Sequence, residues 1–101
     1  LCHFFVMKPL KRILIYDDEA DLLELLRLAL SKLYLVETHT HISHVQEDVL
    51  LYNPHVILMD KNIGIQHGDE AIRLLKSLPD TFHIPIILIS GHERVAEIAQ
   101  E

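Results

Sequence analysis

Short apolar runs alternate along the chain with segments of helical spacing, and this alternation limits the possible folds more than any other feature. The apolar runs are residues 13–16, 34–38, 56–59 and 84–89, and the segments between them place apolar residues three or four positions apart. Strands that are apolar on both faces are typical of a parallel sheet covered by helices on both sides. The sequence therefore predicts an α/β fold, a doubly wound parallel sheet.

The segment that begins at Glu19 is a predicted helix. We expect its buried face to consist of leucines and one alanine at helical spacing, opposite a polar stripe. The residues expected to face the core are Leu22, Leu25, Leu26, Ala29 and Leu33.

Two further helices are predicted. Ser43 and Gln46 could form a capping box for a helix that ends at Asn53-Pro54. The third helix is predicted over residues 69–78, after a loop over residues 61–68, and a last helical segment begins at Glu93.

Composition and charge exclude several classes of protein. The chain has 101 residues and a net charge of −6, so a general phosphate-backbone binder of nucleic acid is not expected. No apolar run is long enough to span a membrane. Cys2 is the single cysteine, which rules out an internal disulfide and favours a cytoplasmic location. We interpret residues 1–10 as an N-terminal extension or upstream remnant, and 11–101 as one domain.

Polar residues follow three of the four predicted strands. Asp17 and Asp18 end the first strand, Asp60 the third and Ser90 the fourth. The carboxyl ends of parallel strands share one edge, where such sheets bind ligands. Clustered carboxylates repel one another unless a cation lies among them, and oxygen ligands of this kind suit Mg²⁺. The set predicts a phosphoryl-transfer site with a carboxylate nucleophile, a metal and a hydroxyl donor.

Taken in order, these motifs resemble those of response regulator receiver domains. The matching segments are 13–19 (ILIYDDE), 56–60 (VILMD), the spacing Asp60–Asn62–Gly68, and 86–91 (IILISG). The resemblance covers the chain from Lys11 to its end. It implies a flavodoxin-like sheet with strand order 2-1-3-4.

The resemblance also implies a role for each matching residue. Asp60 would accept a phosphoryl group from a sensor histidine kinase or a phosphotransfer protein. Asp18 would bind Mg²⁺ directly and Asp17 mainly through a metal-bound water, with Asp60 and the backbone carbonyl of Asn62 as further ligands. Ser90 would hydrogen-bond the phosphoryl group. The protein would be a phosphoacceptor and not an enzyme.

Three other positions carry an implied role. Gly68 would permit the tight entry into the third helix. Asn62 and His92 occupy positions that tune dephosphorylation in the family.

The sequence departs from the family pattern in two places. Ile63-Gly64 stands where receivers usually have Met-Pro or a similar pair. The family also has a fifth strand, with a lysine and an aromatic switch residue, and a last helix. A parallel crossover needs at least about 10–12 residues, so we expect that strand and helix to be absent. Strand 84–89 would then be an exposed edge suited to pairing, for example in a homodimer, and a chain ending at Glu101 would accept phosphate poorly.

Other interpretations stay open. The chain could be a degenerate or truncated receiver that acts as a protein-interaction module without phosphorylation. An aspartate-nucleophile phosphatase has less support, because its Asp-x-Asp pattern after the first strand is missing. His39, His41 and His44 could hold a transition metal, although solvated loop histidines are the simpler interpretation.

Overall fold

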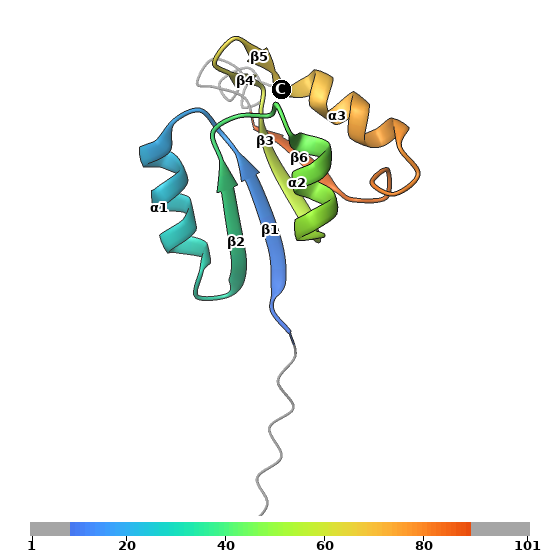
Figure 1. Ribbon diagram of the computed structural model, residues 1–101. Helices are drawn as coiled ribbons and strands as arrows, with labels where there is room; N and C mark the ends of the chain where they lie inside the picture. The colour runs from blue at the N-terminus through green and yellow to red at the C-terminus, as the bar shows by residue number, and fades with distance from the viewer. Residues whose placement is uncertain (1–8, 90–101) are drawn as a thin grey trace, which may run out of the picture.

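The computed structural model describes residues 9–89, and these form a parallel sheet with helices on both faces (Figure 1). Along the chain the elements are β1 (Lys11–Tyr16), α1 (Ala20–Leu30), β2 (Tyr34–His39), α2 (Val45–Tyr52), β3 (Val56–Asp60), β4 (Asn62–Ile63), β5 (Gln66–His67), α3 (Gly68–Ser77) and β6 (Ile86–Ile89). The order in the main sheet is β2-β1-β3-β6. Since β6 is the fourth strand of that sheet along the chain, the predicted order 2-1-3-4 is confirmed.

Side chains alternate across β1 and so contribute to a core on each face of the sheet. Leu14 and Tyr16 pack with α2 and α3, whereas Ile13 and Ile15 pack with α1. Figure 1 shows the same division, with α1 on one face and α2 and α3 on the other. This two-sided burial explains why the strand is apolar at consecutive positions.

The buried face of α1 differs from the predicted one. Leu23 is the buried residue of this helix, and Leu26 and Leu30 pack partly against the same core. Leu25 and Leu33, both predicted to face inward, are exposed to 63% and 69%. The predicted Ala29 is exposed as well, whereas Leu22 and Leu26 are half-buried. The prediction was wrong for Leu25, Ala29 and Leu33 because leucines surround most of the helix, at positions 22, 23, 25, 26, 28 and 30, and their spacing alone does not select one face.

The predicted capping box of α2 is also wrong. His44 occupies the N-cap position, and no side chain caps the helix. The Ser43 hydroxyl instead accepts a hydrogen bond from the amide of Gln66, at 3.3 Å. The predicted end of the helix is confirmed: Asn53 adopts a left-handed conformation (φ 52°), and its N–H donates to the Val49 carbonyl.

Two stretches are more finely structured than the sequence indicates. The predicted loop over residues 61–68 contains the antiparallel pair β4 and β5. The fourth strand of the main sheet begins at Ile86 instead of Ile84, because the Ile84 N–H donates to the Thr81 carbonyl in a turn and Pro85 has no N–H.

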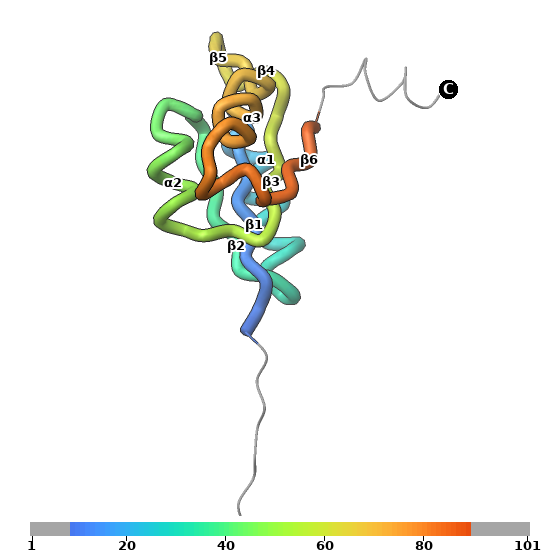
Figure 2. The backbone as a smooth tube through the Cα atoms, turned by 90° about the vertical axis from the view of Figure 1, so that its right-hand side faces the viewer, coloured from blue at the N-terminus to red at the C-terminus, as the bar shows by residue number. Residues whose placement is uncertain are grey.

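Strand β6 is at the edge of the sheet formed by residues 9–89 (Figure 2). Ile87 and Leu88 on this strand are exposed to 54% and 38%. The structure of the described residues thus agrees with the predicted exposure of this strand.

Several predictions concern residues outside the described range. These are residues 1–8 of the N-terminal remnant, which include Cys2, the hydroxyl residue Ser90, the tuning residue His92 and the helix from Glu93. Within residues 9–89, no helix has the length and apolar character needed to cross a membrane.

A candidate cation site at the carboxyl edge of the sheet

Three aspartates meet at the carboxyl edge of the sheet. Strands β1 and β3 are neighbours, with Tyr16 opposite Met59. The residues next after these two, Asp17 and Asp60, therefore lie side by side. One carboxylate oxygen from each of Asp17, Asp18 and Asp60 lies within 4.8 Å of the others. The structure therefore brings together the three carboxylates that the sequence placed at this edge.

Asp17 is the most buried of the three, with 6% of its surface exposed. Its carboxylate accepts a hydrogen bond from the Glu19 N–H at 2.8 Å, just before α1 begins. Its own N–H donates to the carbonyl of His39, at the end of β2. These two bonds fix the position of Asp17 through backbone groups alone.

The electrostatics of the site favour a bound cation. Burial raises the pKa of the Asp17 carboxyl above its usual value, an effect opposed by the Glu19 N–H and reinforced by Asp18. Burial also raises the pKa of Asp60, and the negative charges of Asp17 and Asp18 raise it further. A cation among these groups would stabilise their ionised forms, since opposite charge offsets both burial and mutual repulsion.

The β4–β5 hairpin closes one side of the site. Gly64, at the turn of the hairpin (φ 61°), donates its N–H to a carboxylate oxygen of Asp18 at 3.1 Å. The Gly68 N–H donates to the Lys61 carbonyl at 2.8 Å. The hairpin thus connects the residues after Asp60 back to Asp18, a contact for which the sequence gives no signal because it depends on the turn.

Gly68 begins α3, as the tight-entry prediction expected, and the structure gives the physical reason. A Cβ atom at this position would lie 1.9 Å from the backbone oxygen of Asp60 and 3.0 Å from Cγ of Met59. Only glycine permits this approach of the helix start to the end of β3.

The donor set fits a hard cation such as Mg²⁺. Carboxylate oxygens from three residues converge, and Asp18 is exposed, which leaves room for water and phosphate oxygens. The proposed carbonyl ligand Asn62 lies at the start of β4, and its N–H, with that of Lys61, lowers the pKa of Asp60. Its role as a ligand stays a prediction, as does the role of Ser90.

Comparison with known proteins agrees with this fold. A sensor protein from Polaromonas sp. JS666 is 28% identical, with a TM-score of 0.78, and the match covers 89% of this chain and 73% of that protein. Chemotaxis response regulator CheY4 of Vibrio cholerae has 20% identity and a TM-score of 0.72, with 78% and 67% covered. The phosphorylated cyanobacterial phytochrome response regulator RcpA has 23% identity and a TM-score of 0.73, with 89% and 71% covered.

At 20% and 23% identity, CheY4 and RcpA show only that this chain shares their fold. No curated protein matches the chain significantly. The family model of the response regulator receiver domain matches residues 13–101. The chain therefore belongs to the response regulator receiver domain family.

Proposed function

We propose that this receiver domain accepts a phosphoryl group on Asp60, with Mg²⁺ held by the neighbouring aspartates. The observation that supports the proposal is the convergence of Asp17, Asp18 and Asp60 within 4.8 Å at the edge where such sheets bind ligands. The donor would be a phosphohistidine of a sensor histidine kinase or of a phosphotransfer protein. The protein would serve two-component signalling as a phosphoacceptor, not as an enzyme, and the predicted cytoplasmic location is part of the same proposal.

Each aspartate has a distinct part in the proposed reaction. A carboxylate oxygen of Asp60 forms the bond to phosphorus while the bond from phosphorus to the donor nitrogen breaks, and the donor histidine keeps that electron pair. Asp17 and Asp18 would hold Mg²⁺, with the Asn62 carbonyl as a further ligand. The bound ion would supply positive charge for the phosphoryl oxygens. The Gly64 N–H keeps Asp18 turned toward the site.

The test uses the full chain, acetyl phosphate as a small phosphoryl donor, and intact-mass measurement with Mg²⁺ or with a chelator. We expect the wild type to gain one phosphoryl group only with Mg²⁺, and Asp60→Asn to gain none. Asp17→Asn should require more Mg²⁺ for the same yield. Asp69→Asn is a matched control, because Asp69 lies outside the cluster at the start of α3.

How fast the phosphoryl group is transferred is a separate question from which residue accepts it. The yield should therefore be followed over hours. Phosphorylation of Asp60→Asn to the wild-type level would refute the assignment of the acceptor.

A second candidate function is a protein-interaction module that pairs through β6. The exposed Ile87 and Leu88 on this edge of the described sheet favour it. Size-exclusion chromatography with light scattering tests it: a concentration-dependent dimer lost in Ile87→Lys would support pairing, and a stable monomer would count against it.

A further inference from the structure

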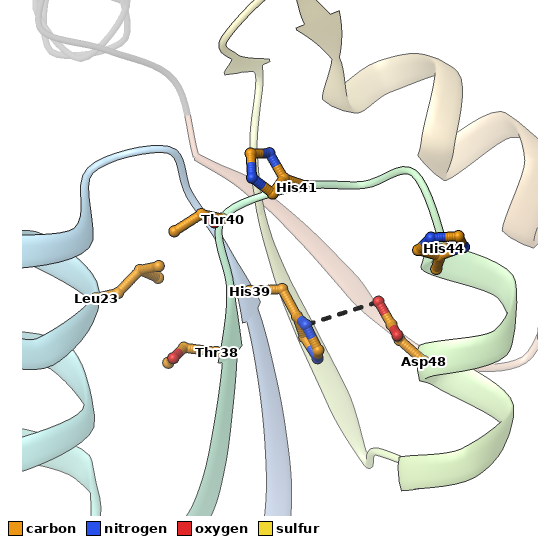
Figure 3. Close-up of a pocket in the computed structure, with 7 residues that line it drawn as sticks. All are labelled: Leu23, Thr38, His39, Thr40, His41, His44 and Asp48. Atoms are coloured by element: carbon orange, nitrogen blue, oxygen red, sulfur yellow. Dashed lines mark ion pairs between the residues drawn. The ribbon is translucent and has the colours of Figure 1, made fainter.

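Three side chains meet where the ends of β1 and β2 lie beside the start of α2. They are Tyr16, the last residue of β1, His39, the last residue of β2, and Asp48, in the first turn of α2. His39 and Asp48 line a cavity of about 320 Å³ and are turned toward each other (Figure 3). Asp17 of the aspartate cluster follows Tyr16 directly, so a group that fixes this end of β1 also affects the position of Asp17.

Tyr16 connects the end of β1 to α2. Its side chain is fully buried, and a buried tyrosine hydroxyl needs a hydrogen-bond partner. The hydroxyl donates to Oδ2 of Asp48 at 2.9 Å, across 32 residues of sequence. The end of β1 therefore cannot shift relative to α2 without the loss of a hydrogen bond that is shielded from water.

His39 is held by the same pair of residues. It lies opposite Tyr16 in the strand register, and the two rings stack with 5.3 Å between their centroids. Its Nδ1 lies 3.8 Å from Oδ2 of Asp48, and its Nε2 lies 2.9 Å from a carboxylate oxygen of Glu37. The backbone carbonyl of His39 accepts the hydrogen bond from the Asp17 N–H, at 3.2 Å. The backbone partner of Asp17 thus belongs to a residue whose ring is fixed by Tyr16, Asp48 and Glu37.

His41 and His44 line the same cavity but are exposed. Among residues 9–89, the aspartate cluster is the only group of three or more histidine, cysteine or acidic residues with ligand atoms within 4.8 Å of one another. The three histidines are therefore not arranged as a transition-metal site, and the contacts of His39 are those to its strand and helix neighbours.

We propose that Tyr16, His39 and Asp48 form a positioning network for Asp17, and that this network sets the affinity of the aspartate cluster for its cation. The inference rests on the proposed function, which assigns a cation to the cluster. Asp17 is attached to the network twice, by the peptide bond from Tyr16 and by the hydrogen bond to the His39 carbonyl.

The affinity of a metal site depends on such indirect contacts. Ligands must be held within roughly 0.5 Å of their productive positions by the residues around them. Groups that orient a ligand without touching the metal change its affinity by about 10–100-fold. The bond from the Glu19 N–H orients the Asp17 carboxylate relative to the start of α1, but it is local. The connection of Asp17 to β2 and α2 passes through the positioning network.

The test measures the cation affinity of the full chain without any phosphoryl donor. Mn²⁺ is the probe, because carboxylate and water ligands suit it as they suit Mg²⁺, and electron paramagnetic resonance counts the free ion. Tyr16→Phe removes the hydroxyl and keeps the ring. We expect it to raise the dissociation constant about three- to tenfold, less than the loss of a direct ligand partner, because Tyr16 acts through the backbone. Asp17→Asn should weaken binding more than Tyr16→Phe does.

Two substitutions of Asp48 separate positioning from simple attraction between charges. Asp48→Asn removes the negative charge but keeps an oxygen that can accept the Tyr16 hydroxyl, so Mn²⁺ affinity should stay within about twofold of the wild type. Asp48→Ala removes the charge and the acceptor together, and should weaken Mn²⁺ binding as much as Tyr16→Phe.

A second readout needs no metal. The exchange of the Asp17 N–H with solvent, followed by NMR in chelator, should be faster in Tyr16→Phe than in the wild type. The N–H of Ile15, on the same strand, is the internal reference. A general loss of stability would accelerate both N–H groups equally, whereas loosening of the positioning network accelerates Asp17 more.

Two control variants are available in the same core. Tyr52→Phe removes the same hydroxyl from the last residue of α2, at the end of the helix far from Asp48. Leu75→Ala destabilises the fold from α3, because Leu75 is fully buried. Both should keep the wild-type Mn²⁺ affinity at a temperature where circular dichroism shows every variant to be folded.

The possible results separate this inference from the proposed function. Wild-type affinity in Tyr16→Phe, alongside weakened binding in Asp17→Asn, would overturn the positioning network and leave the cation site intact. Equal losses in Asp48→Asn and Asp48→Ala, or an equal loss in either core control, would also overturn it. Wild-type Mn²⁺ affinity in Asp17→Asn would contradict the cation site itself, and the inference with it.

Discussion

Substitution of Gly68 by alanine tests how the helix start and the acceptor strand fit together. The added Cβ would lie 1.9 Å from the Asp60 carbonyl oxygen, a distance that real Cβ contacts essentially never show. The neighbouring atom belongs to the backbone, so no side-chain rotation relieves the contact. The start of α3 and the end of β3 must separate by roughly 1 Å, and close-packed interiors resist such a shift.

The magnitude follows from two opposing effects. Overpacking of a well-packed site costs about 1–3 kcal/mol, and a clash with backbone falls at the upper end. Alanine is favoured over glycine in a helix by at most about 1 kcal/mol. The clash is larger, so Gly68→Ala should lower the free energy of unfolding by about 2 kcal/mol, or the melting temperature by about 8 °C or more.

The assay is urea unfolding followed by far-ultraviolet circular dichroism, because the chain has no tryptophan. Gly64→Asn is the control: no atom lies within 4 Å of its Cβ position, and asparagine tolerates the φ of 61° there. That variant should lose less than about 1 kcal/mol. Mg²⁺ should also stabilise Gly68→Ala less than the wild type, because the backbone of Asp60 moves. A Gly68→Ala variant as stable as the wild type would refute the reasoning.

Three further predictions concern the core and the charges. Tyr16→Phe removes the hydrogen bond to Asp48 and should lower the free energy of unfolding by about 1.5–3 kcal/mol, measured by urea unfolding at pH 7. Leu75→Ala should cost about 2–5 kcal/mol because Leu75 is fully buried, whereas Leu74→Ala, at a residue 42% exposed, should cost much less; equal losses would contradict the packing. The raised pKa of Asp17 means that the folded state binds the proton more tightly than the unfolded chain, so this group's contribution to stability falls as pH rises from about 3.8 through the raised pKa. In chelator, Asp17→Asn should therefore become more stable relative to wild type across that window, and Mg²⁺ should reverse the order at pH 7; parallel pH profiles would contradict this.

The sheet and the aspartate cluster could be predicted from the sequence because both depend on strands alone. A strand buried on two faces must be apolar at successive positions, as in 13–16, and its end is marked by the first acid. Parallel pairing then places Asp17 beside Asp60 without any knowledge of helix packing.

Features that depend on packing between elements were not predictable. Leucines surround α1, so its buried face is selected by contact with Ile13 and Ile15 and not by the spacing. Gln66 reaches Ser43 across 23 residues, and this contact stands where the capping box was expected.

The same limit applies to the sites. The bond from Gly64 to Asp18 requires the β4–β5 turn, and the approach of Asp48 to His39 requires the docking of α2 against the sheet. Local spacing carries no signal for either contact.

The most direct test of the central claim is to locate the phosphoryl group by peptide mass spectrometry, after incubation of the full chain with acetyl phosphate. We predict that it is found on the peptide containing Asp60, that it requires Mg²⁺, and that it disappears when Asp17 and Asp18 are both changed to asparagine. A phosphoryl group on another residue, or on Asp60 to the same extent in the presence of a chelator, would contradict the account.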